Sequence, residues 1–140
     1  MTDMGCGTGY RCVGMAINEL GDIAAYGFAS LYDTTWLAMR SVGGVLQTLP
    51  HFPGDDLTIP YGINDQGDVV GYCQAGKAGR GFIFTDADGL LDLQTVLRKR
   101  DQATYRIVSA HGINNAREIA ASALRVADGI TIAVRLEPIQ

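Results

Sequence analysis

The stretch Gly62-Ile63-Asn64-Asp65-Gln66-Gly67-Asp68-Val69-Val70-Gly71 decides the fold, because the chain contains three versions of it. Residues 16–25 (AINELGDIAA) lie 46 positions earlier, and residues 112–121 (GINNAREIAA) lie 50 positions later. Self-similarity at a period of this length is the signature of a repeat architecture. The 140 residues are therefore expected to form an array of three units within one domain.

Two further landmarks place the borders of the units. An apolar run follows each copy at the same two spacings, beginning at Trp36, Phe82 and Ile132. A turn followed by an apolar pair occurs at 43–46 and again at 88–91. Together, the landmarks predict units at about 1–45, 46–90 and 91–140.

The second unit reads as four short strands separated by turn residues. Asn64 to Gly67 is typical of a hairpin turn, since Asn and Asp bond their own backbone and Gly accepts a positive φ. In the third copy Arg117 takes the glycine position, so either that turn changes type or Arg117 adopts an unfavourable conformation. Residues 90–100 alternate rather than show a helical period. The strands expected in this unit are 46–49, 57–63, 68–72 and 81–85.

Four short strands in about 45 residues are typical of one propeller blade, and also of one β-trefoil unit. We therefore predict an all-β fold of three four-stranded, blade-like repeats, a partial β-propeller, with the β-trefoil as the alternative. The 18 glycines agree with many tight turns.

Charge and hydropathy exclude several classes of partner. The net charge is −4 and the sequence pI about 4.9, so the basic surface that nucleic acid requires is not expected. No apolar stretch has the length of a membrane span, and no signal peptide is visible at the N-terminus.

Three cysteines and two histidines, Cys6, Cys12, Cys73, His51 and His111, lack the paired spacing of a zinc site. We expect three free thiols. A small-loop disulfide between the first two cysteines is the alternative if the chain is exported.

Other candidate sites have simpler interpretations. Asp86, Asp88 and Asp92 surround a turn that resembles a Ca²⁺ loop, but Asp-Gly is also a common hairpin turn signal, and a plain turn is expected. Neither histidine lies in a catalytic motif, and His111 takes a repeat position held elsewhere by Tyr61 and Met15. We predict no catalytic, cofactor-binding or metal-binding residues. Two carboxylate pairs are further candidates for catalysis, but solvated turns are expected for both: Asp55 with Asp56, and Asp65 with Asp68. Four aromatic residues could stack on sugars, but core packing is favoured for them: Trp36, Tyr26, Tyr32 and Tyr72.

The pattern resembles the HAF family of probable extracellular repeats. Residues 61–72 match its Ile-Asn-Asp-x-Gly-x-Val-Val-Gly element, and Gly81-Phe82-Ile83-Phe84 is similar to its aromatic strand. Residues 2–5 look like a unit start, and residues 133–138 look like the last strand of a terminal unit. The resemblance implies a β-propeller-like array, an extracellular or cell-surface location, and no established chemistry.

These observations favour a non-catalytic surface or extracellular interaction module with a protein or glycan ligand. A carbohydrate-binding β-trefoil lectin and a hydrolase subunit of a larger propeller are the alternatives. Propellers need four to eight blades, so three units leave two open faces. We predict a homodimer that completes a six-bladed ring, or else further blades that precede residue 1.

Overall fold

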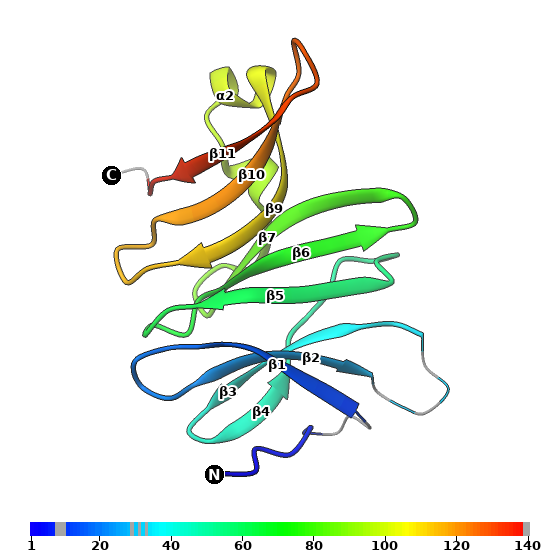
Figure 1. Ribbon diagram of the computed structural model, residues 1–140, viewed down its shortest axis with the longest axis vertical. Helices are drawn as coiled ribbons and strands as arrows, with labels where there is room; N and C mark the ends of the chain where they lie inside the picture. Colours follow the sequence, from blue (N-terminus) through cyan, green and yellow to red (C-terminus); the bar gives the residue numbers. More distant parts are fainter. Residues whose placement is uncertain (8–10, 29, 31, 33, 139–140) are drawn as a thin grey trace.

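The fold consists of three antiparallel sheets that follow one another along the long axis of the molecule (Figure 1). The computed structural model describes residues 1–7, 11–28, 30, 32 and 34–138. Each sheet is built from consecutive strands, and in the described part of the chain the sheets are joined by pairing only at a single parallel bridge between Trp36 and Leu57. The all-β prediction is confirmed, whereas the shared barrel of a β-trefoil is not present among these residues.

The first and second sheets each contain four strands in chain order. The first contains β1 (Arg11–Ile17), β2 (Ile23–Phe28), β3 (Leu37–Val42) and β4 (Val45–Thr48). The second contains β5 (Leu57–Ile63), β6 (Val69–Ala75), β7 (Ala78–Thr85) and β8 (Gly89–Asp92).

The third sheet contains three strands rather than four in the described residues. These are β9 (Tyr105–Ile113), β10 (Ile119–Arg125) and β11 (Thr131–Leu136). Two short helices, α1 (Leu93–Val96) and α2 (Lys99–Thr104), precede it. The prediction of alternation through residues 90–100 was therefore wrong beyond Asp92. The carboxylate of Asp92 accepts a hydrogen bond from the Gln94 amide at 2.9 Å, which caps α1 and ends the strand.

The strand expected at 46–49 belongs to a different sheet from the one predicted. As β4, it pairs with β3 and completes the first sheet instead of opening the second. In the same way β8 pairs with β7. The first and second sheets therefore each end with the strand that follows the turn predicted as a unit border. The expected strand at 57–63 is confirmed as β5.

The second landmark is also corrected by the strand register. Ala25, Gly71 and Ala121 lie seven residues after the three repeated asparagines, and they pair with Met39, Phe82 and Val134. These residues are therefore the structural equivalents, and Trp36 and Ile132 are not equivalent to Phe82. The reason is loop length: β2 ends at Phe28 and β3 begins at Leu37, whereas β6 ends at Ala75 and β7 begins at Ala78.

The hydrophobic core lies between neighbouring sheets. One cluster joins the first and second sheets and contains Ala24 and Ile63, while another joins the second and third and contains Val70 and Ile113. A smaller cluster, in which Met4 and Cys12 pack on Met39, lies on the outer side of the first sheet. Each sheet therefore depends on its neighbour for burial.

In the described residues no helix has the length and apolar character needed to cross a membrane.

Candidate functional site: the asparagine ladder between units

Each repeated asparagine closes its own hairpin turn. The Oδ1 atom of Asn64 accepts hydrogen bonds from the amides of Gln66 at 3.1 Å and Asp68 at 2.9 Å. Asn18 and Asn114 do the same for the amide four residues further on, at 2.8 and 2.9 Å. The predicted turn is confirmed. Gly67 has a φ of 79°, the positive value that was expected of the glycine in this turn.

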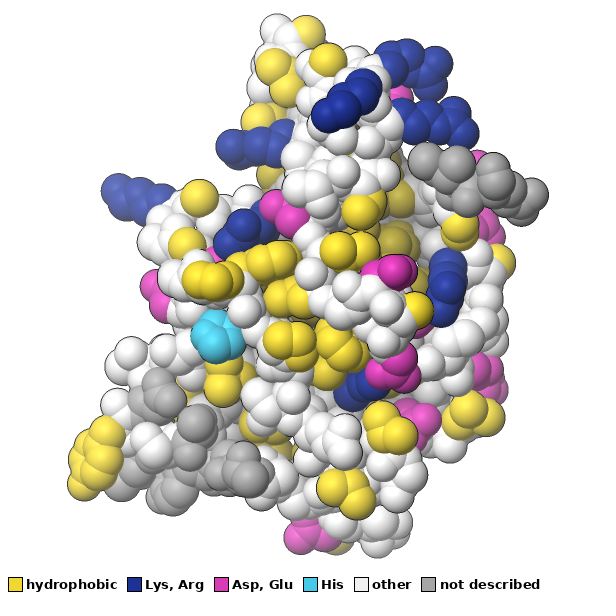
Figure 2. Space-filling view, turned by 180° about the vertical axis from the view of Figure 1, so that it is seen from behind, with side chains coloured by type: hydrophobic (Ala, Val, Ile, Leu, Met, Phe, Trp, Pro, Cys, Tyr) yellow, Lys and Arg dark blue, Asp and Glu magenta, His cyan; other side chains and the backbone are white. Residues whose placement is uncertain are grey.

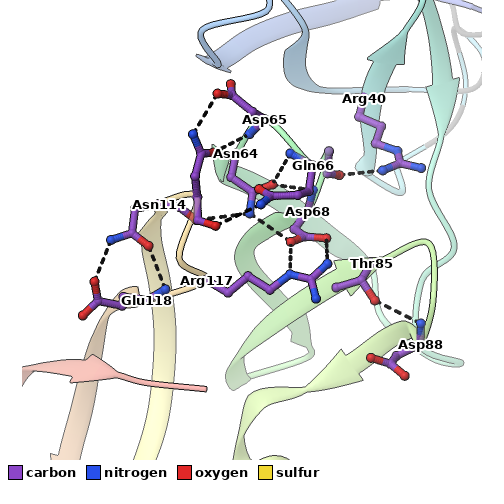
Figure 3. Close-up of polar contacts among 12 residues, drawn as sticks. Arg40, Asn64, Asp65, Gln66, Asp68, Thr85, Asp88, Asn114, Arg117 and Glu118 are labelled. Atoms are coloured by element: carbon purple, nitrogen blue, oxygen red, sulfur yellow. Dashed lines mark hydrogen bonds and ion pairs between the residues drawn. The ribbon is translucent and has the colours of Figure 1, made fainter. Parts of the chain in front are cut away.

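The same asparagines also connect the units. The Nδ2 atom of Asn18 donates to the carbonyl oxygen of Asn64 at 2.9 Å, and Nδ2 of Asn64 donates to the carbonyl oxygen of Asn114 at 3.2 Å. Figure 3 shows this second link beside the contacts of Asp68. We call Asn18, Asn64 and Asn114 the asparagine ladder. It runs in one direction, because each unit donates to the unit that follows it.

The residues after the ladder asparagines form a second, parallel set of contacts. The amide of Glu19 donates to Oδ1 of Asp65 at 3.0 Å, and the amide of Asp65 donates to Oδ1 of Asn115 at 2.8 Å. Nδ2 of Asn115 donates a further hydrogen bond to Oδ2 of Asp65 at 2.8 Å. Asp65, predicted as a solvated turn carboxylate, therefore has a structural role between units.

Arg117 keeps the turn type and adopts the left-handed conformation, with φ 61°, which answers the question left by the sequence. Its Nε donates to Oδ2 of Asp68 at 2.6 Å, and the Asp68 side chain is only 2% exposed. This hydrogen bond raises the pKa of Arg117. Asp68 lies in the second unit, so the residue that breaks the repeat pattern contributes a further link between units.

Arg40 provides a different link, from the first unit to the second. Its side chain is 8% exposed, donates to the carbonyl oxygen of Gly67 at 2.5 Å and pairs with Asp86. The guanidinium also lies 4.9 Å from the centre of the Phe84 ring. Nothing in the sequence pattern indicated this residue, because it lies in a strand outside the repeated decapeptide.

The acidic loop does not collect its carboxylates around one point. Asp86 pairs with Arg40, the amide of Asp88 bonds Oγ1 of Thr85 at 3.0 Å, and Asp92 caps α1. Among the described residues, no group of three or more His, Cys, Asp or Glu side chains could hold a metal ion.

A second buried polar cluster lies inside the second sheet. Asp55 has a fully buried side chain and pairs with Arg80 at 2.7 Å, and Arg80 stacks 4.4 Å from the Phe52 ring. Burial, together with the nearby Asp55 carboxylate, raises the pKa of the Cys73 thiol to about 12. Asp55, which was expected in a solvated turn, is therefore buried and paired with Arg80, whereas Asp56 is exposed.

The two histidines lie apart on the surface. His111 contacts Oγ of Ser109 at 2.8 Å through Nε2, and its ring stacks on Tyr61 with centroids 5.3 Å apart. The sequence analysis did not identify this contact between a hydroxyl and an imidazole. It arises because Ser109 and His111 lie on the same face of β9. His51 is exposed.

Cys6 and Cys12 form a disulfide with Cα atoms 5.6 Å apart, so the expectation of three free thiols was wrong. Cys73 alone is a free cysteine among the described residues, and it is buried. The two bonded cysteines are six positions apart in the chain, and Cys12 lies in β1.

Only two of the four aromatic candidates, Trp36 and Tyr26, pack on each other among the described residues. Trp36 stacks on Tyr26 with centroids 4.9 Å apart and meets Phe28 edge to face at 5.2 Å. Tyr72 donates its hydroxyl to Gln74 at 2.5 Å, while Tyr32 is exposed.

Comparison with known proteins found no matching family model, no matching curated protein and no matching solved structure.

Proposed function

We propose that this chain is a non-catalytic, extracellular or cell-surface repeat module of the HAF type, built as a partial β-propeller, that works by binding a protein or glycan. The observation that carries the proposal is the exposed apolar surface of the first hairpin. Ile17 and Leu20 are each 69% exposed, whereas Ile63, the equivalent of Ile17 in the second unit, is 6% exposed. Large apolar side chains exposed on one hairpin support an interaction site there.

The polar chemistry supports a scaffold rather than an active site. The carboxylates of Asp65, Asp68 and Asp86 are each used in a contact between units. These contacts give the three carboxylates a structural use between units. The three-unit array with two open ends is most simply completed as a homodimer.

The disulfide supports the location. Bonds between cysteines persist in oxidising compartments and are rare in reducing ones. Fractionating the source cells and titrating thiols in the recovered protein tests this part of the proposal. Recovery from the exported or surface fraction with Cys6 and Cys12 oxidised is expected, and a cytosolic protein with three titratable thiols would contradict it.

Glycan binding is a second candidate, favoured by the aromatic cluster at Trp36. Aromatic faces suit the apolar faces of sugar rings, and Trp36 is only half-buried in its stack with Tyr26. A glycan array probed with the labelled protein tests it, with Trp36→Ala as the variant and Tyr32→Ala as the matched surface control. Binding that is lost only in the Trp36 variant would establish the lectin function.

Hydrolysis is tested through the contact between Ser109 and His111. In the described residues, no carboxylate contact to His111 completes a triad of the kind that orients an imidazole. We therefore expect the protein to hydrolyse p-nitrophenyl acetate no faster than its Ser109→Ala variant. A rate that falls at least tenfold in this variant would overturn the non-catalytic assignment.

A further inference from the structure

We propose that a second copy of this chain docks head to tail on the first, so that the asparagine-turn end of the first sheet of one copy covers the same end of the third sheet of the other, and that two such contacts close a dimer. The inference rests on the proposed function and identifies a partner for its exposed apolar surface. Both junctions inside the chain share the asparagine contact and the amide contact of the next residue, and the first and third sheets hold the two halves of a third junction of this kind.

The packing of strands defines the missing contact. The first strand of the second unit, β5, lies against β1, β2 and β3, and the first strand of the third unit, β9, lies against β5, β6 and β7. The corresponding face of β9, β10 and β11 has no following strand within the described residues. By the same rule, its occupant is the β1 of another copy.

The apolar residues at the two ends are complementary. Ala24 and Val70, both 0% exposed, are buried in clusters that contain Ile63 and Ile113 from the following unit. Ala120 takes the same repeat position in the third unit and is exposed. Ile17 takes the position of Ile63 and Ile113, and 69% of it is exposed. Docking would bury Ile17 of one copy against Ala120 of the other.

The polar residues at the ends match as well. Asn114 donates through Nδ2 to Oε1 of Glu118 at 2.9 Å, and no interaction of its second amide hydrogen is found among the described residues. The carbonyl oxygen of Asn18 accepts from the Gly21 amide at 3.2 Å, whereas that of Asn64 accepts both from its own turn and from the preceding unit. One bond from Asn114 to Asn18 of the next copy would extend the asparagine ladder.

Arg135 points independently to the same contact. Ala24 pairs with Arg40, and Ala120 pairs with Arg135, so the two arginines occupy equivalent positions in their units. Arg40 donates a hydrogen bond to the carbonyl oxygen of Gly67 in the next unit. In the first unit, Gly21 occupies the repeat position of Gly67. Arg135 pairs with Glu118 at 3.5 Å and with Glu137, yet its side chain remains 68% exposed, and docking would bring it to Gly21 of the second copy.

The shape of the third sheet agrees with an occupant of this kind. A shallow hollow of about 520 Å³ lies at the turn end of this sheet, lined by Gly112, Asn114, Ala120, Ala133 and Arg135 among others. On the first sheet, Met4 and Cys12 cover the area around Met39 and leave Ile17 exposed. The contact is therefore confined to the ends of the sheets that carry the asparagine turns.

Light scattering of the wild-type chain at micromolar concentration tests the dimer, with an expected mass twice the 14.9 kDa of the chain. Ile17→Glu and Ala120→Lys change exposed side chains, so each variant should fold and yet dissociate. We expect the dissociation constant to rise on the order of 100-fold in each. Arg135→Ala should weaken the dimer less. Val126→Glu is the matched control, because Val126 is 59% exposed and lies in a distant hairpin.

Mixing the two dissociated variants tests the head-to-tail arrangement. In a mixed dimer, one contact is wild type and the other places the introduced carboxylate at position 17 opposite the introduced ammonium at position 120, so association should return. A dimer formed by two like faces would lose association in only one of the two single variants. A monomeric wild type, or unchanged association in Ile17→Glu, would overturn the proposal, and neither result bears on export or on thiol state.

Discussion

Asn64 donates its side-chain amide to the carbonyl oxygen of Asn114, fifty residues away in the chain and 3.2 Å away in space. The same side chain accepts two bonds within its own turn and donates to Oδ2 of Asp68 at 2.9 Å. Because Asn64 is 3% exposed, water cannot replace these bonds. One side chain thus holds a turn and a neighbouring unit together.

Replacing Asn64 by Ala should lower the free energy of unfolding by about 2 to 4 kcal/mol, since several buried polar groups lose their partners together. Asn114→Ala, at the exposed end of the ladder, should cost at most about 1 kcal/mol. Urea unfolding of both variants in the Ile17→Glu background removes any contribution from association. Equal losses would contradict an unequal contribution of the two asparagines to stability.

Gly67→Val should destabilise the protein by roughly 1 to 3 kcal/mol, because a β-branched residue at φ 79° is strained. An added Cβ would also lie 2.8 Å from Nη1 of Arg40. The loss should exceed that of Arg117→Val, where a non-glycine residue already adopts this conformation. Thermal melts compare the two, and a larger loss for the Arg117 variant would show that its contact with Asp68 outweighs the backbone strain.

Arg117→Gly separates these two effects further. The variant relieves the left-handed backbone but removes the partner of a buried carboxylate. We expect a lower melting temperature than wild type, with partial recovery in Arg117→Lys. A rise in melting temperature would mean that Asp68 is satisfied by Asn64 alone.

Cys73 should remain unmodified by a thiol-specific disulfide reagent at pH 8 in the folded protein, because burial raises its pKa to about 12. One thiol should react in urea, and three after reduction of the Cys6–Cys12 disulfide. The raised pKa means that Cys73 stabilises the fold fully below about pH 9 and loses that contribution as the pH rises towards 12. Stability should therefore fall less steeply above about pH 9 in Cys73→Ala. Three reactive thiols before reduction would contradict the disulfide.

Millimolar Ca²⁺ should leave the melting temperature unchanged, since Asp86, Asp88 and Asp92 make separate contacts. A ligand that binds only the folded state must raise stability in proportion to the logarithm of its concentration. A rise of several degrees that disappears in Asp88→Asn would establish a metal site in this loop.

The repeated decapeptide predicted the hairpin turns, the strands beside them and the number of units, because turn chemistry is local. It did not predict which sheet β4 joins, since residues 45–48 have the same apolar character as the first strand of a new unit would have. Nor did it predict that Met39 rather than Trp36 matches Phe82, because the length of the β2–β3 connection shifts the register without changing the apolar pattern.

The contacts between units could not be predicted from the sequence, for a different reason. Arg40 and Arg117 bind partners 27 and 49 residues away, and only the stacking of sheets brings them together. The Ser109 and His111 pair depends on which face of β9 both side chains share. On one face of the molecule, hydrophobic side chains gather midway along the long axis, and Lys and Arg side chains gather at the end that carries the third sheet (Figure 2).

The acceptors of the asparagine ladder are main-chain carbonyl oxygens, and this affects how the repeats are able to diverge. A carbonyl oxygen is the same in every residue, so each link depends on the side chain of the donor residue and only on the backbone of the acceptor residue. The exchange of glycine for Arg117, close to the acceptor Asn114, therefore leaves the link from Asn64 intact.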